Sequence, residues 1–292
     1  MLITKADKYM VEMINRIKEE GFKDINPRPK YADGTPAHTI SVNHTFRTYD
    51  LSKGEFPICT LRPQAWKTGI REIFTIYQKP TNNIATMHDM GVTWWDEWDI
   101  GDGTIGQRYG ATVSRYDLIN NLIKDIQNDP YGRRKIVNLW QEQDLHETPG
   151  LAPCAFLTIW NVRQGEQTDY LDMMLVQRSG DMLTASGPGG INEIQYAALL
   201  TMIAIHTGYT PGVFSHVVAN EQIYDRHMEV ADEMLRRYEE LNKQYEGKLV
   251  LTSSPHLELN PAKTNFYKMT IDDFTMVNYE PIKPQLKLEL GI

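Results

Sequence analysis

Cys154 is the side chain best suited to nucleophilic chemistry in this sequence. It is one of two cysteines and lies in LAPCAFLTIWNV, directly after a proline and before an apolar run. A lone cysteine is more often a small buried hydrophobic residue than a nucleophile. It becomes a nucleophile where nearby cations or a helix N-terminus lower the pKa of its thiol. The positions of the arginines therefore bear directly on its role.

Two short stretches could supply those cations. QRSGD places Arg178 beside Ser179, and a guanidinium next to a hydroxyl can bind a phosphate through several hydrogen bonds. An Arg–Ser pair at the end of a strand nevertheless faces solvent more often than a ligand. GRRK contains Arg133 and Arg134, and basic runs of this kind are usually solvated surface. Neither stretch identifies a site by itself.

A third stretch, GVTWWDEWDIGDGTIGQRYG, is unusually rich in aromatic residues. Trp94, Trp95, Trp98 and Tyr109 are interleaved there with acids and glycines. One interpretation is a core segment that contains a turn. The other is a ligand site in which aromatic faces hold a planar ring system. The residues alone leave both interpretations open.

Apolar periodicity indicates the elements that must position these residues. Helices are predicted around Met10–Ile17 with a stop at Gly21, at 65–77, at 118–126, at 191–207 with a stop at Gly208, and at 222–244. Strands are predicted after the turn in DGTPAHTISV and at 135–140, 155–162, 170–177, 268–277 and 286–290. The segment from Ile194 to Ile205 is apolar on nearly every face, which is typical of a central, buried helix. Helices and strands that mix without strict alternation predict an α+β fold, with a mixed or antiparallel sheet and helices packed on it.

Length, charge and cysteine content narrow the class of protein. The 292 residues show no internal repeat or linker, so one domain over residues 1–292 is expected. A net charge of −8 argues against a protein that coats nucleic acid, although a pocket for a small anion can be locally basic. Cys59 and Cys154 form no disulfide framework or metal motif, which predicts a reducing, cytoplasmic compartment with Cys59 as buried packing. The charged N-terminus does not resemble a secretory signal, and no apolar run is long enough for a membrane span.

Six motifs follow one another in the order and rough spacing found in thymidylate synthases. They are DGTPAHTISV, WWDEWDIGDGTIGQRYG, RRKIVNLW, LAPC, QRSGD and ANEQIYDRH. The resemblance covers most of the chain from about Arg28, and the form most similar in look is the one in Bacillus and some of its phages. No single motif is decisive, but together, in one order, they are highly specific. The resemblance implies a thymidylate synthase-like fold and reverses the first interpretation of Cys154.

The resemblance also implies a reaction, a one-carbon transfer from 5,10-methylenetetrahydrofolate to C5 of dUMP that yields dTMP. Uracil C5 is a poor nucleophile, and thiolate addition at C6 converts it into an enolate carbon. Cys154 stands at the matching position and would be the nucleophile, with Glu72 and Tyr109 in proton transfer. Family members are homodimers with shared active sites. The expected partners are therefore the nucleotide, the folate and a second copy of the chain, and no metal, membrane or nucleic acid is expected.

Binding roles follow from the resemblance as well. For dUMP the implied residues are Arg28, Arg178, Ser179, Asn192, Gln222 and Tyr224, with Arg133 and Arg134 crossing into the neighbouring site of a dimer. For the folate they are Trp95, Trp98, Asp181 and the terminal Ile292. The Asn192 amide both donates and accepts, so it could read the O4 and N3–H edge of uracil. It could also cap the N-terminus of the long helix, and Glu72 could be an exposed helix residue; both alternatives stay open.

Some residues depart from the family pattern. The family's GDxHxY appears as ANEQIY, which puts Asn220 in place of its aspartate and Gln222 in place of its histidine. The family's LGLPFN appears as the longer TASGPGGIN, with Ile191 in place of a phenylalanine. One alternative is therefore a deoxyuridylate hydroxymethylase, which quenches the same intermediate with water. Another is a catalytically silent nucleotide- or RNA-binding relative, which the net charge and the retained catalytic residues disfavour.

Overall fold

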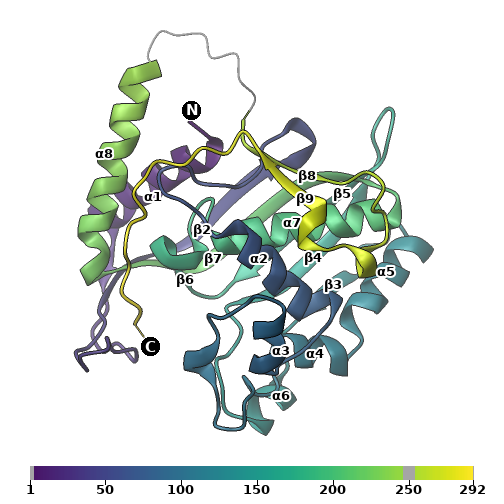
Figure 1. Cartoon of the computed structure of the whole chain (residues 1–292), viewed down its shortest axis with the longest axis horizontal. Coiled ribbons are helices and arrows are strands. Elements are labelled where there is room, and N and C mark those ends of the chain that lie inside the picture. The colour runs from purple at the N-terminus through teal and green to yellow at the C-terminus, as the bar shows by residue number, and fades with distance from the viewer. Residues whose placement is uncertain (1–2, 246–253, 292) are drawn as a thin grey trace.

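A seven-stranded mixed sheet is the frame on which the chain is built (Figure 1). The computed structural model describes residues 3–245 and 254–291. The strands are β1 Phe22–Lys23, β2 Thr39–Asp50, β3 Lys135–Asn138, β4 Ala155–Arg163, β5 Tyr170–Gln177, β6 Gly180–Asp181 and β7 Thr210–Tyr224. Their order is β1-β2-β7-β5-β4-β3, and β6 also pairs with β7. Neighbours are antiparallel except that β5 and β6 run parallel to β7, so the predicted α+β fold with a mixed sheet is confirmed.

Helices pack around this sheet. They are α1 Lys5–Glu20, α2 Trp66–Ile73, α3 Ile84–Asp89, α4 Gly110–Arg115, α5 Leu118–Asn128, α6 Glu142–Glu147, α7 Ile191–Thr207 and α8 Met228–Tyr245. Single 3-10 turns lie at Leu51–Lys53, Asp96–Trp98, Asp225–His227, Phe266–Lys268 and Ile271–Asp273, and π-helical turns at Phe74–Gln78 and Met182–Ser186. A second sheet joins β8 His256–Leu259 to β9 Phe274–Val277. Among the described helices, none combines the length and the hydropathy that crossing a membrane requires.

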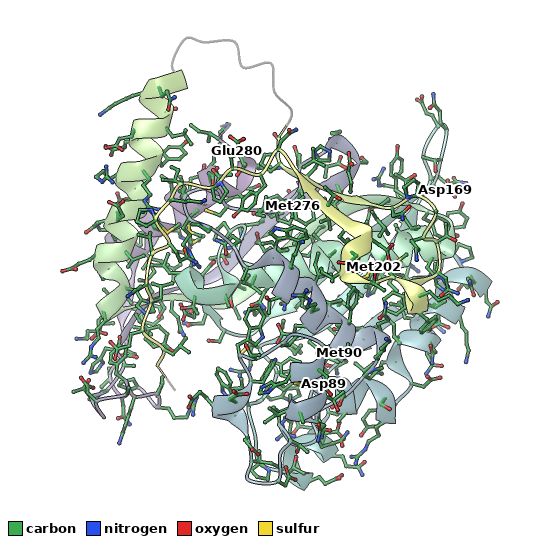
Figure 2. All side chains as sticks on the ribbon, in the orientation of Figure 1. Asp89, Met90, Asp169, Met202, Met276 and Glu280 are labelled. Carbon is green, nitrogen blue, oxygen red and sulfur yellow. The ribbon has the colours of Figure 1, made fainter. Side chains whose placement is uncertain are left out.

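Helix α7 is the centre of the core, as its apolar pattern predicts. It packs between α2 and β7, and every residue from Ile194 to Ala204 is buried. Met202, on this helix, lies in the middle of the molecule (Figure 2). Gly208 ends the helix with a φ of 84°, a left-handed conformation that glycine adopts at little cost. The N-terminal turn of α7 therefore belongs to a helix that is buried on all faces, which fixes the position of that turn.

Most of the predicted elements are confirmed with shifted ends. Helix α1 ends at Gly21, α5 covers the segment before Pro130, and β3, β4 and β5 match three predicted strands. The helix predicted at 65–77 is α2 followed directly by a π-helical turn that ends at Gln78. The sequence pattern located these elements because each buries one apolar face.

The helix predicted to start at Gln222 is wrong in its first part. Strand β7 continues to Tyr224, and α8 begins at Met228. Strand β7 is paired with β2 on one side and with β5 and β6 on the other. Backbone hydrogen bonds from both sides therefore hold Gln222 in an extended conformation, which the local sequence pattern does not reveal.

The C-terminal segment also differs from its prediction. KMTIDDFTMV forms strand β9 only over Phe274–Val277, because Thr270 and Asp273 form a reciprocal capping box around the preceding turn. LKLEL, predicted as a strand, belongs to neither sheet of the described residues. Its Leu286 and Leu288 instead pack against the apolar cluster that α1 and α8 share. Side-chain burial, rather than a backbone ladder, holds this segment in place.

Candidate active site

Cys154 lies at the turn that leads into β4, and Arg178 holds that turn. The Arg178 guanidinium donates from Nε to Pro153 O at 3.0 Å and from Nη2 to Ala152 O at 2.7 Å. Its Nη2 is also 3.4 Å from the Cys154 Sγ. The Arg178 backbone N–H donates to Cys154 O at 3.0 Å, so backbone and side chain both fix the cation beside the thiol.

Two opposing effects act on the pKa of the Cys154 thiol. Burial raises the pKa of the Cys154 thiol, whereas Arg178 and Arg28 act to lower it. Arg28 is exposed on the loop before β2, yet its charge reaches both this thiol and Tyr224. The two arginines therefore favour the thiolate and oppose the effect of burial.

Tyr109 lies directly against the Cys154 backbone. The Cys154 N–H donates to the Tyr109 hydroxyl at 3.2 Å. Tyr109 has a φ of 47°, which is strained for a residue with a side chain. Burial raises its pKa above the ordinary tyrosine value, so the phenol keeps its proton at neutral pH. Its ring packs on Trp95, with 5.2 Å between the ring centroids.

Glu72 is buried in the core of the site, which excludes the exposed-helix interpretation. Its two carboxylate oxygens accept hydrogen bonds from Trp95 Nε1 and Gln195 Nε2. Burial raises the pKa of Glu72, and these donors oppose the shift. Trp95 also contacts Trp98 edge to face at 5.5 Å. The aromatic segment thus contributes both core packing and one wall beside a buried carboxyl whose pKa is raised.

Asn192 is the second residue of α7 and does not cap it, because the N-cap is Gly190. Its Oδ1 accepts from Ser186 Oγ at 2.8 Å and, more weakly, from Gln177 Nε2 at 3.4 Å. Its Nδ2 donates to Gln195 Oε1 at 2.9 Å. The amide is therefore fixed at both ends, and Gln195 connects it to Glu72.

Three polar residues of this network are not among those that the sequence predicts for the site. They are Gln177, Ser186 and Gln195. Gln195 did carry a signal, since it is a buried polar residue in an otherwise apolar helix and such a residue needs partners. The other two follow only from the way that β5, the Met182–Ser186 turn and α7 meet.

Strands β6 and β7 bring Asp181 and Tyr224 to the same region. Asp181 pairs with Gln222 in register, and its carboxylate accepts from Thr184 N at 3.3 Å. Burial raises the pKa of Asp181, and burial raises the pKa of Tyr224 to about 12. Asp181 and the thiol of Cys154 both contribute to the shift of Tyr224. Ser179 lies half-buried next to Arg178, and its carbonyl accepts from Gln177 Nε2 at 2.9 Å.

Arg133 and Arg134 are not brought to Cys154 within one chain. Both are exposed just before β3. Lys135, the next residue, pairs with Trp160 on β4. Trp160 is six residues beyond Cys154, which is about 20 Å at about 3.3 Å per strand residue.

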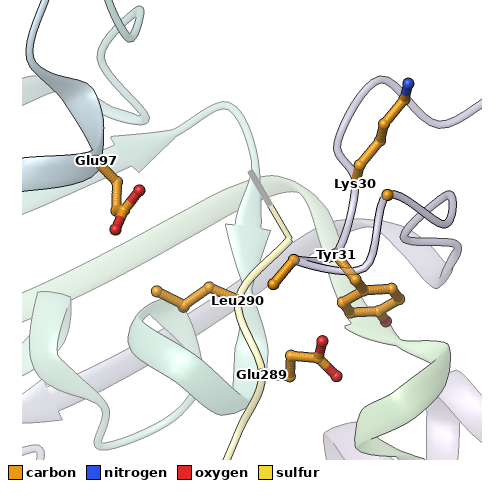
Figure 3. Close-up of a pocket in the computed structure, with 7 residues that line it drawn as sticks. Lys30, Tyr31, Glu97, Glu289 and Leu290 are labelled. Atoms are coloured by element: carbon orange, nitrogen blue, oxygen red, sulfur yellow. The ribbon is translucent and has the colours of Figure 1, made fainter.

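A cavity of about 520 Å³ opens beside the C-terminal segment (Figure 3). Its lining includes Lys30 and Tyr31 on one side of that segment and Glu97 on the other. Glu289 and Leu290 belong to the segment itself, and Arg226 pairs with Glu289 at 2.9 Å.

Ile292, a predicted folate contact, lies outside the described residues. Within residues 3–245 and 254–291 no group of three or more His, Cys, Asp or Glu side chains could hold a metal ion.

Comparisons with known proteins agree on one family. The family model described as thymidylate synthase matches residues 8–292. Thymidylate synthase of Streptococcus pneumoniae strain 70585 is 47% identical over 293 residues, which cover 99% of this chain and 100% of the relative. The Lactococcus lactis subsp. lactis enzyme of the same name is 46% identical over the same coverage. The solved structure of thermostable thymidylate synthase A from Bacillus subtilis superposes with a TM-score of 0.84 at 32% identity, over 98% of this chain and 99% of that one.

Proposed function

The chain belongs to the thymidylate synthase family, and we propose that its reaction runs through Cys154 as the nucleophile. The family's activity is the methylation of dUMP to dTMP with 5,10-methylenetetrahydrofolate as cosubstrate. The observation that carries the assignment is the 3.4 Å contact between Arg178 Nη2 and the Cys154 Sγ. A cation this close stabilises the thiolate, which is the form that can add to C6 of uracil. The new C–S bond leaves negative charge on O4 and makes C5 nucleophilic.

Proton handling would fall to Tyr109, which lies against the Cys154 backbone, and to Glu72, whose partner Trp95 packs on the Tyr109 ring. Tyr109 keeps its proton and lies against Cys154, so it would hydrogen-bond a water that takes the C5 proton rather than take that proton itself. Burial raises the pKa of Glu72, so this carboxyl holds a proton more readily than an ordinary glutamate and would take and return one in the site. Both groups are catalytic in this proposal.

Nucleotide recognition uses charge for the phosphate and amide geometry for the base. Arg178, Ser179 and Arg28 would hold the phosphate. Asn192 would bind the O4 and N3–H edge of uracil, because an amide both donates and accepts. Gln222 and Tyr224 would hydrogen-bond the sugar from β7.

The folate would lie against the aromatic wall. Trp95 and Trp98 form an edge-to-face pair, and ring faces of this kind suit a planar pterin. Asp181, half-buried at the end of β6, would accept hydrogen bonds from the pterin, and Ile292 would contact the bound ligand. When bound, the folate supplies the methylene group and the reducing hydride. The relatives at 46–47% identity carry the name thymidylate synthase, which supports methylation over hydroxymethylation.

We also propose that the chain acts as a homodimer through the sheet face turned away from α7. One cross-strand row on that face is apolar, since Phe46, Val217, Val176 and Leu157 are paired in register. Phe46 is 58% exposed, and Ile136, on β3, is 52% exposed. An apolar sheet face of this kind is typical of an interface between copies. A facing copy would let Arg133 and Arg134 bind the phosphate of the partner's site, which lies beyond their reach within one chain.

The expected unit is a single catalytic domain that works in the cytoplasm. Segments from Phe22 to Tyr224 join in one seven-stranded sheet, which supports one domain. Both cysteines are free thiols, which fits a reducing compartment.

Product identification tests the activity. The protein is incubated with dUMP and methylenetetrahydrofolate, nucleotides are analysed by mass spectrometry, and folates by absorbance. We expect dTMP with an equal amount of dihydrofolate. Hydroxymethyl-dUMP with tetrahydrofolate, or no new nucleotide, would contradict the proposal.

A further inference from the structure

We propose that a buried charge cluster orients the base-reading amide of Asn192, and that His216 is the positioning residue which transmits this orientation. The cluster, called the Arg47 cluster here, consists of Arg47 on β2, Glu193 on α7, and His216 and Glu221 on β7. All four side chains are 0–1% exposed. The proposal rests on the proposed function, in which Asn192 binds uracil.

Arg47 has an acceptor for each of its N–H groups. Its Nε donates to Glu193 Oε1 at 2.7 Å, and its Nη1 donates to both oxygens of Glu221 at 2.8 and 2.7 Å. Its Nη2 donates to Ser186 O at 3.2 Å and lies 3.2 Å from His216 Nδ1. A guanidinium has five N–H donors, so this one cannot turn without losing a bond inside the core.

The Arg47 cluster also connects the two stretches that depart from the family pattern. Glu221 belongs to ANEQIY, and Glu193 directly follows TASGPGGIN. Glu193 Oε2 accepts from Gly189 N at 2.7 Å and from the Tyr49 hydroxyl at 2.8 Å. Hydrogen bonds to Arg47 therefore connect these two stretches to each other.

The position of one proton on His216 follows from its neighbours. Gln177 Nε2 donates to a backbone carbonyl, Ser179 O, at 2.9 Å, so the other amide atom, Oε1, is the one that faces His216. This oxygen lies 3.1 Å from His216 Nε2 and can only accept, so Nε2 carries a hydrogen. The assignment holds for the neutral ring, where Nδ1 accepts from Arg47, and for the charged ring, where Nδ1 donates to Glu193 at 3.0 Å.

Gln177 passes this orientation to Asn192. With its oxygen bound to His216, its Nε2 donates to Ser186 Oγ at 2.7 Å. The Ser186 hydroxyl then donates its own hydrogen to Asn192 Oδ1 at 2.8 Å. The Asn192 Nδ2 donates one hydrogen to Gln195 and keeps one for a ligand. The amide thus offers a donor to a carbonyl such as O4 of uracil, whereas cytosine has an amino group at that position.

Nucleotide binding to variants tests this proposal. Dissociation constants for dUMP and dCMP are measured by calorimetry on the full-length protein. His216→Phe keeps a ring in the core but removes the donor to Gln177, and Ser186→Ala removes the next donor in the path. For each variant we expect the preference for dUMP over dCMP to fall about tenfold, since one misdirected hydrogen bond is worth about that factor.

Two controls separate positioning from stability. His216→Gln supplies an N–H donor toward Gln177, and we expect it to keep the preference within about threefold of wild type. Tyr49→Phe removes a hydrogen bond to Glu193 that lies off the path, so it should lower the melting temperature and leave the preference unchanged.

An unchanged preference in Ser186→Ala, or in a folded His216→Phe, would overturn the inference. An equal loss of preference in Tyr49→Phe would overturn it too, since the effect would then be general loosening. Failure of the proposed function gives a different result, because wild type itself would then not prefer dUMP.

Discussion

The two cysteines lie in opposite electrostatic surroundings although both are largely withdrawn from water. Cys59 is 0% exposed, and burial together with the Asp7 carboxyl raises the pKa of its thiol well above the ordinary value. Cys154 is half-buried, and there Arg178 and Arg28 counteract the effect of burial on the thiol pKa. The prediction that Cys59 is buried packing is therefore confirmed. The difference shows that access and the sign of the neighbouring charge, rather than residue type, separate an inert thiol from a reactive one.

Alkylation should separate the two thiols most strongly. We expect iodoacetamide at pH 8 to modify Cys154 at least about 100-fold faster than Cys59, because Cys59 becomes accessible only when the surrounding core opens. Peptide mass mapping over a time course measures both rates in one sample. Equal rates at the two positions would break the comparison.

Two buried carboxyls, Glu72 in the candidate site and Asp7 beside Cys59, should differ in their effect on turnover. The Glu72 carboxylate accepts from side chains of the site, whereas the Asp7 carboxylate accepts from the Thr4 N–H and from the N–H and hydroxyl of Thr60. We expect Glu72→Gln to lower kcat about 100-fold, the usual scale for loss of an acid–base group. Steady-state dTMP formation measures this, and a kcat within about threefold of wild type would remove Glu72 from the proton path.

Glu72→Gln should also change how the stability of the fold depends on pH. Burial raises the pKa of Glu72 above 4.5, so the folded state binds this proton more tightly than the unfolded state does. Wild-type stability from this group is then highest below pH 4.5 and falls as the pH rises through the folded pKa. The melting temperature of Glu72→Gln, relative to wild type, should therefore rise with pH above 4.5. A difference that stays flat with pH would show that the Glu72 pKa is not raised.

Removing the Arg178 cation should slow alkylation of Cys154, by a smaller factor than the difference between the two cysteines. Arg178 lowers the pKa of the Cys154 thiol, so Arg178→Met should move the pH profile of its alkylation to higher pH. A shift of one pKa unit gives about a tenfold slower reaction at pH 7. Arg163→Met, which removes an exposed arginine paired with Asp172, is the matched control and should leave the profile unchanged. Identical profiles for the two variants would contradict the role given to Arg178.

Asp7 should affect stability and leave turnover alone. Its carboxylate forms the capping box of α1 with Thr4 and bonds the backbone N–H of Thr60 at 2.7 Å. Asp7→Asn should cost about 1–2 kcal/mol of unfolding free energy through these lost bonds, with kcat unchanged. Denaturant titration measures the first quantity. A loss of kcat without a loss of stability would mean that this carboxyl is linked to the chemistry.

Local patterns and motif order predicted the parts of the molecule that depend on neighbours in sequence. The apolar run of α7 and its stop at Gly208 predict this helix correctly, because burial on all faces gives it an apolar composition all round. The last residues of β7, from Gln222 to Tyr224, fit a helix by local pattern but form a strand, because their partners on β2 and β6 lie far away in the chain. The Arg47 cluster could not be predicted at all, since its four residues come from three separate elements and each looks like an ordinary surface residue in sequence. Motif order can propose a role for a single residue such as Asn192, but it does not reveal the hydrogen bonds that orient the side chain.

The most direct measurement compares dTMP formation by Cys154→Ala and Cys59→Ala. Each variant is first shown to be folded by circular dichroism and is then incubated with dUMP and methylenetetrahydrofolate, with dTMP measured by mass spectrometry. We predict that Cys59→Ala forms dTMP at close to the wild-type rate and that Cys154→Ala forms none above the uncatalysed background. Appreciable dTMP from a folded Cys154→Ala would contradict the assignment of Cys154 as the nucleophile.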